Sequence, residues 1–213
     1  MVGDPIRSEH GVAAEPELGS LLRSYPQVVA LVSMFVLYGN MSMLMSMTPL
    51  VMAHEGMSLW AISLTVAIHV AGMYGLSAPL GRLADRFGRR LVLLLGLSLS
   101  TLGTGLAALG SAYVPIVLGL FLIGVGWCCG NVATPAIIAD TTAPEVRGRA
   151  MGLNLSLSAL ASVTTPLLGG FLMERFGPAE LLVVSVAVLC PCLAIVLRLR
   201  EIAPGQYAHA VSF

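Results

Sequence analysis

The sequence contains the decapeptide Gly81-Arg82-Leu83-Ala84-Asp85-Arg86-Phe87-Gly88-Arg89-Arg90. It separates two long apolar runs, at about 58–80 and 91–110. An arginine-rich connection between helices would explain the positive charges, but not the two glycines and the aspartate at these offsets. Gly81 would let a neighbouring helix approach closely, and Asp85 could face the positive N-terminus of another helix. We therefore expect this segment to make contacts between helices.

Apolar residues dominate the chain on both sides of this segment. Of the 213 residues, 57% are hydrophobic and 10% are charged, which is less than half the charge of a typical soluble domain. Six apolar runs stand between charged residues or Gly/Pro breaks, at about 27–53, 58–80, 91–110, 113–137, 148–172 and 179–198. A helix needs about 20 residues to cross roughly 30 Å of hydrocarbon. The sequence predicts an all-α membrane protein with six transmembrane helices at 26–200, a polar segment at 1–25 and a tail at 201–213.

The arginines indicate how these helices are oriented. All eleven basic residues are arginine, and only Arg175 lies outside the termini and the connections after the second and fourth runs. The positive-inside rule then places both termini in the cytoplasm. The net charge is zero, so we expect no nucleic-acid partner. The expected location is a bacterial cytoplasmic membrane, with the lipid bilayer as the first partner.

An internal repeat relates the two halves of the chain. Gly170-Phe171-Leu172-Met173-Glu174-Arg175-Phe176-Gly177 resembles residues 81–88 at an offset of 89 positions, or three predicted helices. Three crossings separate the two copies, so they should end on opposite sides of the membrane. This layout predicts two inverted three-helix repeats.

The decapeptide fits G-x-x-x-D-R-x-G-R-R, and here the chain resembles the major facilitator superfamily. In that family the motif lies in the loop between the second and third helices of a six-helix half. The resemblance implies that this loop latches the cytoplasmic side while the transporter faces outward. It also implies a second such loop at 144–152. The gating residues so implied are Gly81, Asp85, Arg86, Gly88, Arg89, Arg90, Asp140, Glu145, Arg147 and Arg149.

Two departures from family patterns indicate which half the chain resembles. N-terminal halves carry R-x-x-Q-G in the fourth helix, but here Leu120 and Ile123 take the Arg and Gln positions before Gly124. The chain thus looks like a C-terminal half. A half cannot enclose a central pathway, so the resemblance implies a second six-helix half, as a homodimer or as a separate N-terminal half, unless the chain is a fragment of a longer protein.

The fifth helix resembles the glycine-rich pattern of antiporters, although Ala161 and Thr165 replace its middle glycines. Small residues at these places more often serve tight helix packing than the direction of transport. The predicted packing residues are Gly152, Pro166, Gly169 and Gly170.

The candidate cargo ligands are two pairs of residues spaced four apart. Met41 and Met45 share one face of the first helix, and His69 and Met73 share one face of the second. The two pairs lie at similar depth, within about one helical turn. Thioethers and an imidazole suit Cu(I) and suit Mg²⁺ or Ca²⁺ poorly. The pattern also resembles the bacterial major-facilitator copper importers of cytochrome oxidase assembly, which implies these four residues as the copper ligands.

Other interpretations of the same helices stay open. Methionine fills apolar gaps, and a buried histidine can simply bond a carbonyl of another helix. Met43 and Met47 form a rival pair. A cavity for an organic solute could instead be lined by Asn40, Trp127, Asn131 and Asn154. The four cysteines, which all lie inside predicted helices, are expected to act as small apolar residues.

Together these patterns predict a secondary transporter that works by alternating access, with Cu(I) as substrate and no cofactor. The first alternative is a permease or exporter of small organic molecules. The second is a half that does not transport and only assembles with a partner. The sequence contains no nucleophile-base pair, phosphate-binding loop or catalytic metal motif, so we do not expect an enzyme.

Overall fold

Seven helices fill the described part of the chain. The computed structural model describes residues 24–108 and 112–200. The helices are α2 (Tyr25–His54), α3 (Leu59–Gly75), α4 (Ser77–Phe87), α5 (Arg89–Ala108), α6 (Tyr113–Thr141), α7 (Pro144–Phe176) and α8 (Pro178–Leu197). They form six segments long and apolar enough to cross a membrane, with α3 and α4 as one span. The predicted all-α fold with six transmembrane helices is confirmed. The terminal segments predicted at 1–25 and 201–213 lie almost wholly outside the described residues.

The helices are longer than the apolar runs that predicted them. The second run was expected to end near residue 80, and the decapeptide was expected to be a loop. Instead α4 continues to Phe87, Gly88 is the only residue between the helices, and α5 begins at Arg89. The fifth span likewise extends from Pro144 to Phe176. Hydropathy marks the part of a helix inside hydrocarbon, whereas the helical backbone continues into its charged ends.

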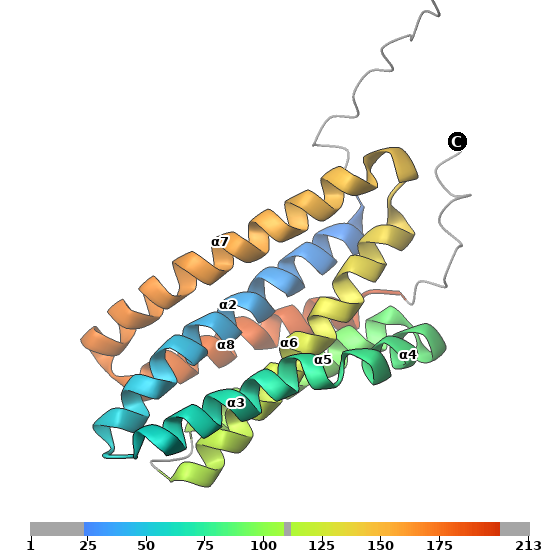
Figure 1. Ribbon diagram of the computed structural model, residues 1–213. Coiled ribbons are helices and arrows are strands. Elements are labelled where there is room, and N and C mark those ends of the chain that lie inside the picture. Colours follow the sequence, from blue (N-terminus) through green and yellow to red (C-terminus); the bar gives the residue numbers. More distant parts are fainter. Residues whose placement is uncertain (1–23, 109–111, 201–213) are drawn as a thin grey trace, which may run out of the picture.

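The two copies of the repeat end in the same way. Gly88 has φ 99° and Gly177 has φ 105°, a backbone region that residues other than glycine rarely adopt. Each glycine N–H donates to the carbonyl four residues earlier, of Ala84 and Met173, at 3.0 Å. Figure 1 shows the ends of α4 and α7 at opposite ends of the bundle. The local structure thus agrees with an inverted repeat.

One span is interrupted near its middle. Leu76, with φ −103° and ψ 5°, separates α3 from α4. Pro79 has no N–H with which to bond the carbonyl of Gly75, so the helical hydrogen-bond ladder cannot pass through this point unchanged. The hydroxyl of Ser77 donates to the carbonyl of Tyr74 at 3.0 Å, beside this break.

The bundle is built around α2 and α6, which are its most buried spans (Figure 1). α5 packs on α6, and α8 packs on α5 and α2. α7 packs on α2, and α3 packs on α6. We call the side of the bundle where Tyr74 and Asn131 are exposed, and Tyr38 is partly exposed, the open side.

Glycines set the distance between α5 and α6. A Cβ added to Gly103 would lie 2.5 Å from the carbonyl oxygen of Gly119, and one on Gly119 would lie 2.6 Å from that of Gly103. Gly96 and Gly126 oppose each other in the same way, at 2.8 and 2.6 Å. In a bilayer, where lipid tails are as apolar as leucine, close packing of this kind stabilises helix contacts.

Candidate functional site

Arg89 joins three helices at the end of the bundle that holds most of the described arginines. Its guanidinium lies 3.1 Å from a carboxylate oxygen of Asp140 on α6 and 3.2 Å from one of Asp85 on α4. It also donates to the carbonyl of Ala84 at 3.0 Å. The Arg89 side chain is 10% exposed and that of Asp140 is 20% exposed, whereas that of Asp85 is 74% exposed. The Arg89–Asp140 pair is therefore the shielded part of this cluster.

The neighbouring arginines bond mainly to backbone and aromatic groups. Arg90 donates to the carbonyl of Leu197 at 2.7 Å, which ties the start of α5 to the end of α8. The guanidinium of Arg86 lies 5.2 Å from the centre of the Phe87 ring. Arg147 donates to the carbonyl of Thr142 at 3.4 Å.

Other residues of the implied gate lie on the surface of this chain. Glu145 and Arg149 are exposed near the start of α7. No atom lies within 4 Å of a Cβ added to Gly81. A helix that packs on Gly81 would thus have to come from outside the described residues.

His69 lies inside the bundle, against the backbone of α6. Its ring is 1% exposed, and Nδ1 lies 2.6 Å from the carbonyl oxygen of Leu120. A carbonyl only accepts hydrogen bonds, so Nδ1 carries the proton and, in the neutral ring, Nε2 keeps its lone pair. Nε2 is buried and has no hydrogen-bond partner among the described residues. His69 thus bonds a carbonyl of another helix, which is one of the interpretations that the sequence left open.

The methionines of the predicted ligand set belong to the surrounding apolar packing. Met41 and Met73 are buried in one cluster with Ile123 and Trp127, and Met45 packs against the edge of this cluster. Within residues 24–108 and 112–200, no three His, Cys, Asp or Glu side chains lie close enough to hold a metal ion.

Three aromatic rings meet at the open side. Trp127 of α6 makes edge-to-face contacts with Tyr38 of α2 and with Tyr74 of α3, at centroid distances of 5.3 and 5.7 Å. Trp127 is buried, while Tyr74 is 61% exposed. The sequence analysis identified Trp127 but named neither tyrosine. Their position deep inside apolar runs was the available signal.

The asparagines proposed as cavity lining have different surroundings. Asn131 is exposed on the open side. Asn40 instead donates to the hydroxyl of Thr104 on α5 at 3.3 Å, so its amide points to the covered side. Asn154 is buried on α7, and its Oδ1 has no hydrogen-bond partner in the part of the chain that is described.

The predicted packing residues of α7 also differ in their surroundings. A Cβ on Gly169 would lie 2.5 Å from the side chain of Met43 on α2. Gly152 and Gly170 have no such neighbour within 4 Å. Pro166, inside α7, is partly exposed. Of these three glycines, Gly169 alone would meet another helix within the part of the chain that the structure describes.

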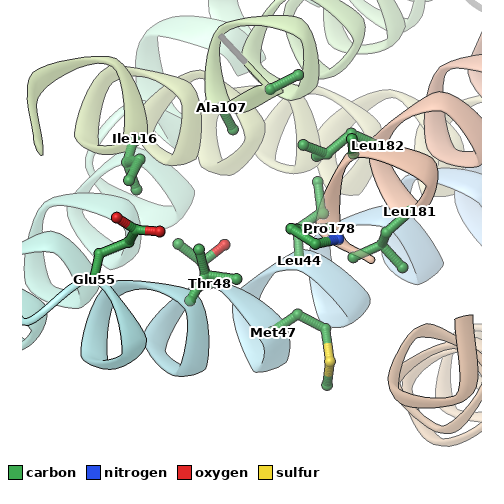
Figure 2. Close-up of a pocket in the computed structure, with 12 residues that line it drawn as sticks. Leu44, Met47, Thr48, Glu55, Ala107, Ile116, Pro178, Leu181 and Leu182 are labelled. Atoms are coloured by element: carbon green, nitrogen blue, oxygen red, sulfur yellow. The ribbon is translucent and has the colours of Figure 1, made fainter. Parts of the chain in front are cut away.

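A pocket of about 240 Å³ opens at the end of the bundle away from Arg89, between α2, α5, α6 and α8. Figure 2 shows Glu55 and Thr48 of α2 on one wall, with Ala107 and Ile116 across from them. The other walls are mostly apolar. None of the predicted cargo ligands lines this pocket.

Known proteins share both the sequence and the fold. The chain is 34% identical over 155 residues to YddS of Bacillus subtilis, an uncharacterized MFS-type transporter, covering 70% of this chain and 34% of YddS. It is 32% identical over 138 residues to the riboflavin transporter RfnT of Brucella anthropi, covering 64% of this chain and 34% of RfnT. The crystal structure of a D-xylose-proton symporter superposes with a TM-score of 0.69 and 19% identity.

The chain spans about a third of the length of these two relatives and covers 48% of the symporter chain, against 84% of itself. The resemblance to copper importers finds no support in these relatives. The sequence pattern of the Major Facilitator Superfamily matches residues 30–210, and with the six-span fold this shows that the chain belongs to the major facilitator superfamily.

Proposed function

We propose that the chain forms half of a secondary transporter that moves small organic solutes across a membrane by alternating access. Family membership and the six-span bundle support the transporter class. The cargo class rests on the open side, where Tyr74 and Asn131 are exposed near the middle of their spans. Exposed amide and phenol groups are costly in lipid but suit a solute pathway. The relative named as a riboflavin transporter supports an organic cargo.

Uptake into vesicles tests this proposal directly. Proteoliposomes that contain the chain should accumulate radiolabelled riboflavin faster than protein-free liposomes when an ion gradient is applied. Matched liposomes with a heat-denatured preparation control for leakage. If the chain, alone or with a co-reconstituted six-helix half, moves neither riboflavin nor D-xylose, it is a half that only assembles and does not transport.

We also propose that the open side packs against a second six-helix unit. A lone half would leave Asn131 and Tyr74 facing lipid. We expect crosslinking of a single cysteine at position 131, in a background without native cysteines, to yield a dimer in mild detergent. A cysteine at exposed Val183 of α8 is the matched control and should crosslink weakly. If crosslinking yields no dimer at any protein concentration while transport is normal, this expectation is contradicted.

Cu(I) uptake is the second candidate, because the buried Nε2 of His69 has no hydrogen-bond partner among residues 24–108 and 112–200, and Met41 and Met73 share one cluster. Under the organic-solute proposal, His69→Leu should leave cellular copper unchanged, since the ring serves to bond Leu120. Copper accumulation that depends on the chain and disappears in His69→Leu, but not in Met43→Leu, would replace the organic cargo by Cu(I).

For the location we propose a bacterial cytoplasmic membrane with the Arg89 end on the cytoplasmic side. The support is the uneven distribution of arginines. Of the arginines within the described residues, only Arg175 lies at the opposite end of the bundle. Labelling of a single cysteine at position 86 by a membrane-impermeant reagent should require opened cells.

A further inference from the structure

The geometry points to Tyr74, backed by Trp127 and Tyr38, as the surface on which a planar, uncharged aromatic solute stacks. This inference rests on the proposed function, because the surface is a cargo site only in a transporter. It narrows the cargo from small organic solutes in general to one chemical class.

The three rings lie well inside the apolar part of their spans. The apolar runs at about 27–53, 58–80 and 113–137 have their middle residues at about 40, 69 and 125. Tyr38 and Trp127 lie within two residues of these middles, and Tyr74 lies five residues, or roughly 8 Å, from its own. Tyrosine and tryptophan normally favour the membrane interface, where their polar groups meet water. A tyrosine 61% exposed at this depth therefore indicates a surface that meets solute or water and not lipid tails.

The packing of the rings holds Tyr74 in place. Trp127 is wedged between the two tyrosines at edge-to-face angles of 73° and 72°, which leaves it buried while Tyr74 stays exposed. Side chains fixed in this way lose little conformational entropy when a ligand binds. Aromatic surfaces of this kind stack planar rings with little dependence on the ring's substituents.

Asn131 supplies a polar group beside the rings. It lies one helical turn from Trp127 on α6, about 6 Å along the axis. Between Gly119 and Ile138 it is the only exposed residue of α6. Its amide can both donate and accept hydrogen bonds, as the edge of a nitrogen heterocycle requires.

Charged side chains lie at least two helical turns from the rings along the helices that carry them. On the span that carries Tyr74, the nearest charged residues are Arg82 and Asp85, 8 and 11 residues away, or roughly 12 and 16 Å along the helix. On α6 and just after α2, the nearest are Asp140 and Glu55, 13 and 17 residues from Trp127 and Tyr38, or roughly 20 and 25 Å. Among described residues, His69 is the nearest titratable group on α3 besides Tyr74, and it is buried against α6. An organic cation would find no counter-ion here, so an uncharged ring system fits best.

Binding of flavins to the purified full chain in detergent tests this inference. The probes are riboflavin and lumiflavin, its ring system without the sugar chain, and binding is followed by equilibrium dialysis. Both should bind, and ribitol, the sugar chain alone, should not compete. Tyr74→Leu should weaken binding about tenfold or more, as loss of a stacked ring does. Tyr74→Phe keeps the ring and should bind as the parent does.

Trp60→Leu is the matched control, because Trp60 is also an exposed aromatic residue of α3 but lies at its far end. Equal affinity of Tyr74→Leu and the parent, equal loss in Trp60→Leu, competition by ribitol, or no binding of either flavin would each overturn the stacking surface. Normal flavin binding without uptake in any vesicle would instead overturn the proposed function and leave the surface standing.

Discussion

Gly103→Leu is expected to separate α5 from α6 and to unfold the chain at a markedly lower temperature than Gly105→Leu. The added side chain at position 103 would start 2.5 Å from the carbonyl oxygen of Gly119 and 2.9 Å from the side chain of Ile123. A backbone carbonyl cannot rotate out of the way, so the helices must move apart. Overpacking of this kind typically costs about 1 to 3 kcal/mol, and more where backbone has to shift.

Gly105 is the matched control on the same helix, since a Cβ there meets nothing within 4 Å. The native thiols provide the measurement. Cys128 and Cys129 of α6 are buried, and a thiol-reactive fluorophore labels them only as the bundle opens. Cys190 is exposed and is first replaced by serine. Identical labelling temperatures for both leucine variants would show that the α5–α6 contact is loose.

The fold could be predicted because a bilayer leaves few choices. Each apolar run of about 20 residues must satisfy its backbone internally, so six runs become six helices. The repeated glycines at 88 and 177, singled out in the sequence, stand where α4 and α7 end. The helix lengths were underestimated because charged residues such as Arg86 remain helical beyond the hydrocarbon.

The candidate site was harder to predict because spacing reveals a shared face but not the neighbour of that face. Met41 and Met45 do share a face, yet nothing in the sequence indicates that His69 lies against the carbonyl of Leu120. Asn40 was expected near the pathway, but its partner Thr104 lies 64 residues away on α5. Spans that are apolar on all sides carry no periodic signal of which side is open. Tyr74 could therefore be placed only by the packing of α3 on α6.

Arg89→Leu is expected to loosen the end of the bundle where α4, α5 and α6 meet, and to lower the unfolding temperature far more than Arg86→Leu. The Arg89 guanidinium is shielded, forms an ion pair with Asp140 and donates a hydrogen bond to the carbonyl of Ala84. Its removal leaves the carboxylate of Asp140, only a fifth exposed, without its counter-charge. Breaking a largely buried ion pair from one side costs about 3 kcal/mol.

Two variants separate the ion pair from general effects of charge at this end. Arg86→Leu removes a neighbouring arginine that is exposed and stacked on Phe87, so it should change the unfolding temperature little. Asp85→Asn removes the exposed partner of Arg89 and should also change the unfolding temperature little.

In the proposed transporter, however, Asp85→Asn should slow uptake, because the exposed face of this carboxylate is available to a partner half. The thiol-labelling temperature measures stability, and vesicle uptake measures the gate. If Arg89→Leu unfolds at the same temperature as Arg86→Leu, the pair with Asp140 contributes no stability, and other contacts at this end, such as that of Arg90 with Leu197, hold the helices together.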